Sequence, residues 1–402
     1  ALNTTAHNLT NVNTEGYSRQ QVLLTDLSYN KIGETKVTIN SVGIGTTVSS
    51  IRLVRDNFLD VAYREEKGRE NFYLAQYEGI DEVQNYFGEL ESNTFNKNLQ
   101  DLWSAIQEVQ KESNSGVSRS ALIATASTFM DKANKIQSQL VSYQTNLNGK
   151  IISQVDSINE KADKILALNK QIIAIEASGV EGANDLRDQR DAILDELSGL
   201  IDIDVTENSD HSVDVYAEGR CLVTLDRTYK MSTANSDTNS DFLIPMWEDD
   251  QTEVFNFARV PSAETGTDVG SLKGLLMTRG GYTPTYADIP VAPVKPVESD
   301  YANTADYNTA YAKYQVDVQQ YEADTYIYNN TVEPYAVSNI IATFDQLIHG
   351  IVTGINDVLS PNKEITLSDG TKMTVLDEEK AGVGLGNGND TIQGTELFTR
   401  NG

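Results

Sequence analysis

The chain has 402 residues, and 31 basic against 59 acidic side chains give a formal net charge of −28 at pH 7. Nucleic acids and anionic membrane surfaces are bound through basic patches, so we expect neither as a partner. The single cysteine, Cys221, excludes an internal disulfide. The residues around it alternate, which predicts a small buried side chain in a strand rather than a nucleophile.

The length is sufficient for two or three domains, each with its own core. The sequence contains neither a long apolar run nor a cleavable signal peptide, so it predicts no membrane span. The chain has no initiator Met and ends at Asn401-Gly402, and we expect it to be truncated at the C-terminus.

The first residues predict a short helix with one apolar edge, formed by Leu2, Leu9 and Val12. This helix is expected to end by Asn13, because Thr14-Glu15-Gly16 is typical of a helix stop followed by a turn. The remaining residues are largely Asn and Thr and bury little apolar surface. We therefore expect the segment to order only against something else.

Four residues of the same stretch suit turns and caps. Asn8, Asn11 and Asn13 can bond nearby backbone groups, which favours caps and turns over a helix interior. Gly16 suits a backbone position with positive φ.

Residues 20–50 alternate weakly and predict short strands or extended chain. From Ser49 the apolar period changes to three and four, which predicts helices over 51–90 and 95–110. Ser92-Asn93-Thr94 separates these two helices and can cap the second.

The longest predicted element is a helix over 118–178 that no Pro interrupts. Its apolar residues form a heptad seam with one stutter, and at about 1.5 Å per residue the helix is on the order of 90 Å long. We expect this seam to lack full cover within the chain, so that partner helices complete it. The seam consists of Phe129, Ala133, Ile136, Leu140, Tyr143, Leu147, Ile151, Val155, Ile158, Ala162, Ile165 and Ile172.

A further helix is predicted after Gly182, with Asn184 or Asp185 as its cap and an apolar edge that includes Leu194 and Leu197. Its charged residues have two interpretations: a solvated face with i,i+3 and i,i+4 ion pairs, or a subunit contact. These residues are Asp185, Arg187, Asp188, Arg190 and Asp191.

Residues 200–262 alternate with a period of two and predict a β domain that ends with a strand over 254–257. Residues 270–277 predict a return to helix. In 284–334, prolines predict an extended entry to a helix with a tyrosine stripe. The stripe either packs this helix onto its own domain or forms a ligand or receptor surface.

Residues 340–359 predict another amphipathic helix, followed by short strands at 365–367 and 373–375. Residues 384–392 partly match the calcium-binding nonapeptide, but that fold needs several stacked copies. We expect an ordinary turn there.

No hydrolase elbow or phosphate-binding loop occurs in the sequence. The three histidines, His7, His211 and His349, lie in different segments and form no zinc motif. We therefore expect no enzyme, no catalytic residue, no metal site and no cofactor.

Three blocks of sequence resemble bacterial flagellar axial proteins. Residues 8–17 are similar to the N-terminal motif of rod, hook and hook-associated proteins, with Leu-Thr for Ile-Ala and Glu for the usual Pro. Residues 43–60 and 183–198 resemble two segments of the FlgK family of hook-associated junction proteins. The resemblance covers roughly residues 1–220.

This resemblance implies a structural subunit of the bacterial flagellum that connects hook to filament by packing into a tubular helical array. The implied partners are other copies of the chain, the hook protein, the second junction protein and an export chaperone for the C-terminal region. The implied location is extracellular, reached through the flagellar type III pathway without a cleaved signal peptide.

We expect subunit packing to involve Asn8, Asn11, Asn13, Gly16, Tyr17, Arg52, Arg55, Asp56, Asp185, Arg187, Asp188 and Arg190. The alternative function is an extracellular adhesin or binding module on a coiled-coil stalk, which would use the tyrosine-rich module at 301–335.

The expected fold class is α+β and multidomain: a long-helix, coiled-coil-like rod, then a mainly β domain with an inserted tyrosine-rich helical module. The expected domains are 1–48 (N-terminal motif and extended segment), 49–199 (helical rod), 200–283 (β outer domain), 284–335 (inserted module) and 336–402 (returning helix and Gly/Asp-rich segment).

Overall fold

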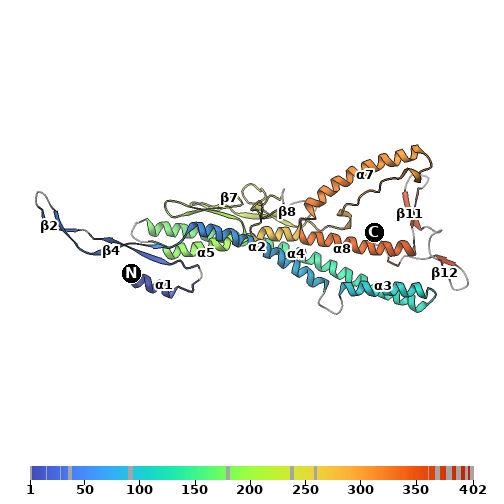
Figure 1. The fold of residues 1–402 in the computed structure, drawn as a ribbon, viewed down its shortest axis with the longest axis horizontal. Helices are drawn as coiled ribbons and strands as arrows, with labels where there is room; N and C mark the ends of the chain where they lie inside the picture. The colour runs from blue at the N-terminus through green and yellow to red at the C-terminus, as the bar shows by residue number, and fades with distance from the viewer. Residues whose placement is uncertain are drawn as a thin grey trace. The chain divides into compact units, whose positions relative to one another are not determined.

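The structure is a computed structural model, drawn as a ribbon in Figure 1. The chain forms two compact units, residues 1–77 with 148–276, and residues 78–147 with 277–402. The helices α2 (Asn57–Phe87) and α4 (Gly116–Glu176) each contribute to both units. The structure describes residues 2–14, 16–27, 29–34, 39–88, 94–177, 182–235, 240–257, 260–360, 362–366, 372–376, 383–385, 391–393 and 397–398.

The first unit combines helices with short antiparallel strands. Besides parts of α2 and α4, its helices are α1 (Leu2–Thr10), α5 (Asn184–Leu200) and most of α6 (Ser271–Arg279). Its strands are β1 (Gln20–Asp26), β2 (Tyr29–Glu34), β3 (Ile39–Gly43), β4 (Thr46–Leu53), β5 (Ile203–Glu207), β6 (Val213–Ala217), β7 (Arg220–Val223), β8 (Met231–Asn235) and β9 (Leu243–Trp247).

The strands predicted over 20–50 are confirmed, because β1 pairs with β4 and β2 pairs with β3. Figure 1 shows this ribbon leading into α2. The helix predicted from Ser49 is wrong at its start, since the backbone of β4 pairs with β1 and α2 begins only at Asn57. Asp56 marks the change, because its Oδ1 accepts a hydrogen bond of 3.0 Å from the Phe58 N–H and so caps α2.

Most of the predicted β structure after residue 200 is also confirmed. β5, β6 and β7 form one three-stranded sheet, and β8 pairs with β9. Alternate residues of β6 are at most 3% exposed, so one face of this sheet packs inward. The strand predicted over 254–257 is wrong: Val254 and Phe255 are buried, and the Val254 N–H bonds the Pro245 carbonyl of β9 at 3.0 Å, but no strand forms there. Apolar burial alone does not require a strand at that position.

The seam predicted on α4 is buried along its whole length. Each of its residues, from Phe129 to Ile172, is 8% exposed or less. The expectation that the seam lacks cover within the chain is therefore wrong. Helical periodicity could show that the seam needs a partner, but it could not show that distant parts of the same chain supply one.

Two asparagines join α4 to the strands of the first unit. Asn159 Nδ2 donates to the Met231 carbonyl at 2.8 Å, and Asn159 Oδ1 accepts from the Met231 N–H at 2.9 Å. Asn169 forms the same pair of bonds with Val213, at 2.8 and 3.2 Å. Each amide side chain thus takes the place of a neighbouring strand and satisfies backbone groups that would otherwise be buried unpaired.

The second unit packs its helices around phenylalanines. Its remaining elements are α3 (Phe95–Lys111), η1 (Tyr286–Asp288), η2 (Glu298–Asp300), α7 (Thr304–Thr331), α8 (Ala336–Leu359), β10 (Asn362–Thr366), β11 (Lys372–Leu376), β12 (Val383–Leu385) and β13 (Thr391–Gln393). Phe344 of α8 contacts Phe87 and Phe95 edge-on, with ring centroids 5.4 and 5.3 Å apart. Phe95 also contacts Phe129 of α4.

Helix α7 carries the predicted tyrosine stripe. Tyr307, Tyr311 and Tyr314 are half-buried, and successive rings of the three contact one another at about 6 Å. At the other end of the helix, the Tyr328 hydroxyl donates to Asn339 Oδ1 of α8 at 3.0 Å. No residue of α7 is fully buried. Both interpretations of the stripe therefore stay predictions.

The α+β class is confirmed, as are the predicted helices at α3, α6 and α8 and the strands at β10 and β11. The predicted domain boundaries stay a prediction. The turn predicted within 384–392 lies largely outside the described residues. In the part of the chain that the structure describes, no helix is long and apolar enough to cross a membrane.

We expect Asn159→Ala to lower the free energy of unfolding of the first unit by about 1–3 kcal/mol, because it leaves both buried backbone groups of Met231 unpaired. Trp247 lies opposite Met231 in the β8–β9 pair, so its fluorescence reports on this unit in a urea titration. The fluorescence of the second tryptophan, the exposed Trp103, is removed by making all variants in a protein that carries Trp103→Phe.

Asp156→Ala, an exposed change on the same helix, is the control and is expected to alter stability little. Equal effects of the two substitutions on the free energy of unfolding would contradict the stabilising role of the Asn159–Met231 hydrogen bonds.

Candidate functional site

The candidate site is the contact between α5 and the N-terminal segment. This segment is defined as residues 2–14 and 16–20. All of its residues lie in the first unit. Tyr17 is central to it: its hydroxyl donates to Asn8 Oδ1 at 2.7 Å and lies 3.0 Å from His7 Nδ1. Asn8 also forms two bonds of 2.9 Å with the backbone of Gln20. These contacts fold the segment back on itself.

Gly16 allows the chain to approach α5 closely. Its φ is +77°, which confirms the positive φ predicted from the sequence. A Cβ at this position would lie only 3.1 Å from the Cβ of Ala192 on α5. A larger residue would therefore combine backbone strain with a collision against the helix.

Two carboxylates of α5 hold the segment. Asp188 Oδ2 accepts from the Ser18 N–H at 3.3 Å, and Asp185 Oδ1 accepts from Gln20 Nε2 at 3.3 Å. Asp188 is 7% exposed, and burial raises the pKa of its carboxyl. Burial, followed by the charges of Asp188 and Asp185, also raises the pKa of Tyr17. Beside these contacts lies a cavity of about 290 Å³.

A cluster of charges joins the start of α2 to α5. Arg55 Nε lies 2.6 Å from Asp60, and its other nitrogens lie 3.2 Å from Asp191 and 3.6 Å from Asp195. Arg64 Nε donates to Asp195 at 2.7 Å. Burial opposes the charge of Arg55, but Asp191, Asp60 and Asp195 outweigh that effect and raise its pKa. Burial raises the pKa of Asp191.

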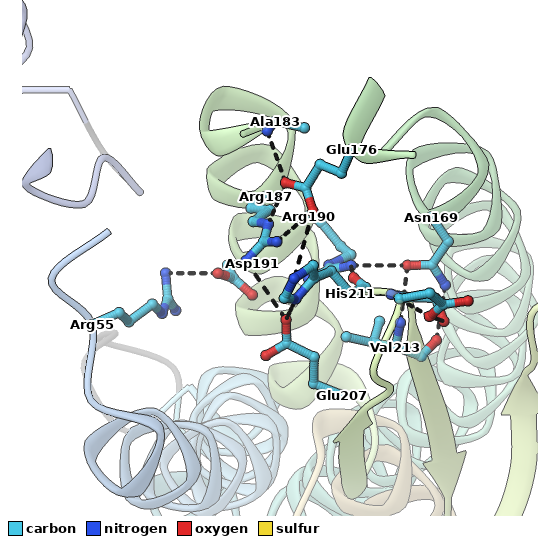
Figure 2. Close-up of polar contacts among 12 residues, drawn as sticks. Arg55, Asn169, Glu176, Ala183, Arg187, Arg190, Asp191, Glu207, His211 and Val213 are labelled. Carbon is cyan, nitrogen blue, oxygen red and sulfur yellow. Dashed lines mark hydrogen bonds and ion pairs between the residues drawn. The ribbon is translucent and has the colours of Figure 1, made fainter. Parts of the chain in front are cut away.

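A second cluster joins α5 to the end of α4 and to the β sheet, as Figure 2 shows. Arg187 makes two bonds with the Glu176 carboxylate, at 3.0 and 2.5 Å. Arg190 donates to Asn169 Oδ1 at 3.0 Å and to the His211 carbonyl at 2.7 Å. Burial lowers the pKa of Arg190, which is 3% exposed.

The two interpretations of the charged residues of α5 can now be compared. A fully solvated face is wrong, because Asp188 and Arg190 are buried and their partners lie outside the helix. The predicted cap is wrong as well. Ala183 precedes α5 without a side-chain cap, while Asn184 Nδ2 donates to the Ile51 carbonyl at 3.1 Å and Asp185 is engaged by Gln20.

The other predicted site residues lie nearby, and their contacts are local or on the surface. Asn11 Nδ2 donates to the His7 carbonyl at 3.1 Å, and Asn13 is exposed. Arg52 donates to Gln21 Oε1 at 3.2 and 3.0 Å on the surface. The structure therefore gathers the predicted residues around α5 and the strands beside it. Their role in subunit packing stays a prediction.

Sequence reasoning missed Asp60, Arg64, Glu176 and Asp195, which complete the two clusters. One signal was present: Asp188, Asp191 and Asp195 follow helical spacing and form an acidic stripe on one face of α5. In the part of the chain that the structure describes, no group of His, Cys, Asp and Glu is arranged to hold a metal ion.

A family model described as the helical domain of the flagellar hook-associated protein FlgK matches residues 80–289. The chain is 31% identical to flagellar hook-associated protein 1 of Bacillus subtilis over 52% of its own length and 41% of the relative's. It is 27% identical to the protein of that name from Salmonella typhimurium over 51% of its length and 36% of the relative's. The chain thus spans about two fifths of the length of these curated relatives.

The flagellar hook junction protein FlgK from Burkholderia pseudomallei has a similar structure, with a TM-score of 0.44 and 22% identity. That similarity covers 55% of this chain and 38% of the solved one.

We expect Asp188→Asn to change how stability depends on pH. The pKa of Asp188 is raised above 3.8 in the folded state, so the folded state binds more protons between 3.8 and the raised value. Stability contributed by this group is present at low pH and declines as pH rises through that window. The advantage of the Asn variant over the parent chain should therefore grow with pH, by at most about 1.4 kcal/mol per unit.

Urea unfolding at a series of pH values between 3.5 and 7 measures this difference. Asp156→Asn, at an exposed position of α4, serves as the control for a surface carboxylate. A pH-independent difference between the Asp188 variant and the parent would show that burial of this carboxyl has no such effect.

Proposed function

The chain belongs to the family of the flagellar hook-associated protein FlgK, and on this premise we propose that it is a structural subunit of the bacterial flagellum. The resemblance found in the sequence is confirmed by the family model, which matches more than half of the chain. In the proposed function, copies of the chain pack side by side into a tubular helical array that connects the hook to the filament.

The observation that carries this proposal is the orientation of α1. Its polar residues Thr4, His7 and Asn8 are buried or half-buried on the chain itself. The predicted apolar edge faces solvent instead, with Leu2 87% and Leu9 74% exposed. An isolated soluble chain gains nothing from this arrangement, since burying the apolar edge would be favourable. A helix that docks by its polar side and presents its apolar side is suited to contact with a neighbour.

The start of α2 also exposes large apolar side chains. Phe58, Leu59 and Val61 are 78%, 61% and 58% exposed, close behind the salt bridges of Arg55. Burying a side chain of this size is worth about 1.5–3 kcal/mol. Several such residues per subunit, repeated around an array, would provide a substantial driving force for assembly.

The proposal divides the predicted packing residues by role. Gly16, Tyr17 and Asp188 position the segment that presents the apolar edge, and they act on neighbours through that segment. Asn13 and Arg52 are exposed and can contact a neighbour directly.

The further partners and the location are inferred from the family. We propose the hook protein and the second junction protein as neighbours, and a cytoplasmic chaperone for the C-terminal region before export. Export through the flagellar type III pathway would place the protein outside the cell. The relatives reported above are hook-associated proteins, so the proposal includes no catalytic activity, and the adhesin alternative gains no support from them.

Gly16→Val tests the proposal in a strain of the source bacterium that lacks the gene. The wild-type gene should restore filaments, and electron microscopy of the uncomplemented strain should show hooks without filaments. We expect the Gly16→Val gene to restore none, because the strained position displaces the segment from α5.

Gly149→Val is the matched control, since a Cβ at this position in α4 meets nothing within 4 Å. It should restore filaments. Circular dichroism of both purified variants checks that the first unit is folded. Normal filaments on the strain without the gene would refute the junction function, and normal filaments with Gly16→Val would refute the role of the N-terminal segment.

A further inference from the structure

A second cavity of the first unit lies between β4, α5 and the start of α2, with a volume of about 550 Å³. This volume is within the range of ligand-binding pockets, about 300–1,000 Å³. Five arginines line it together with backbone of β4: Arg52, Arg55, Arg64, Arg187 and Arg190. The contacts described above do not fill this space.

One wall of the cavity is the free edge of β4. Among the residues that the structure describes, the strand belongs to a two-stranded sheet, so only its edge beside β1 is paired. The Val54 N–H donates to the Arg19 carbonyl at 2.8 Å, and in the antiparallel register this makes alternate residues face β1. The backbone groups of Ile51 and Leu53 therefore face outward. The Ile51 carbonyl accepts a bond from Asn184, so in the described part of the chain the open group at this residue is its N–H.

The charges of the cavity are incompletely compensated. Each of its carboxylates has an arginine within 4 Å: Asp60 and Asp191 lie beside Arg55, and Glu176 and Glu207 lie beside Arg187. In the described part of the chain, no carboxylate oxygen lies within that distance of Arg52 or Arg190. Arg52 binds only the Gln21 amide, and Arg190 binds only neutral oxygens.

One buried guanidinium nitrogen among the described residues also lacks an acceptor. Arg190 is 3% exposed and its Nε makes no hydrogen bond, whereas Arg64 Nη2 lies 3.5 Å from Asp191 Oδ1. Buried charged donors are normally satisfied, because leaving them unbonded forfeits their interaction with water. Both residues line the cavity, and their cationic side chains favour a negatively charged occupant.

We propose that this cavity is a strand-addition site for an extended acidic peptide segment of a neighbouring subunit. Its backbone pairs with the Ile51 N–H and with Leu53, and its carboxylates face Arg52. The proposal rests on the proposed function, which supplies the neighbour. An extended segment fits because the free edge offers hydrogen bonds at strand spacing, and an acidic one fits because the uncompensated charges are positive.

A fluorescently labelled peptide of four Thr-Glu repeats is the probe, and the matching Thr-Gln peptide is its neutral control. Fluorescence anisotropy with the full chain should show binding of the acidic peptide that is at least about tenfold tighter than that of the neutral one. Binding should weaken as salt is raised to about 0.15 M, since partly exposed charges are screened.

Two substitutions with matched controls test the two parts of the site. Arg52→Glu should weaken acidic-peptide binding by about tenfold or more, whereas Lys150→Glu, the same charge change at an exposed position on α4, should leave it within about twofold. Ile51→Pro removes an outward N–H and should abolish binding, whereas Ile51→Ala keeps that N–H and should preserve it.

The outcomes separate this site from the function on which it rests. Failure of the acidic peptide to bind, equal binding of both peptides, or full binding by Arg52→Glu would each overturn the site. If the Ile51→Pro variant does not fold, peptide binding by the Arg52→Glu variant tests the site. If Arg52→Glu loses the peptide but restores filaments in the deletion strain, the strand does not come from a neighbour, and the junction function stands. If the wild-type gene restores no filaments, the junction function fails whatever the peptide does.

Discussion

Asp188, Asp191 and Asp195 lie along one face of α5, where they bind Ser18, Arg55 and Arg64. Burial opposes the charge of such carboxylates, and it raises the pKa values of Asp188 and Asp191. Arg55 and Arg64 offset this effect for Asp191 and Asp195, while Asp188 is bound by the backbone N–H and the side chain of Ser18. The start of α2 is therefore bound to α5 by ion pairs, and the N-terminal segment is bound to it by hydrogen bonds.

The binding of the N-terminal segment by hydrogen bonds fits the exposed apolar edge of α1. A segment held by hydrogen bonds of about 3 Å and by a close glycine contact can be positioned without a hydrophobic core of its own. The apolar residues Leu2 and Leu9 then remain available to a neighbour. The polar contacts determine where the segment lies, and in the proposed array the apolar edge would provide free energy of association.

The long helix α4 follows a different logic. Its apolar seam is completed within the chain, so α4 is a scaffold and not an open surface. Asn159 and Asn169 add direction to this packing, because each recognises one backbone position of the β structure. Apolar contacts alone would tolerate a shift of the strands along the seam, whereas paired amide bonds fix the register.

Local patterns in the sequence determined the helices, most strands and the turn at Gly16. These depend on spacing and on the conformational preferences of nearby residues, such as the positive φ of glycine. Only the tertiary structure decided what covers the seam of α4, where the charges of α5 find partners, and which side of α1 faces out. The partners of Asp188 and Arg64 lie 170 and 131 residues away, so no local period records them. The start of a helix predicted at Ser49 is wrong for the same reason. The apolar residues there have helical spacing, but pairing with β1 places them in strand β4.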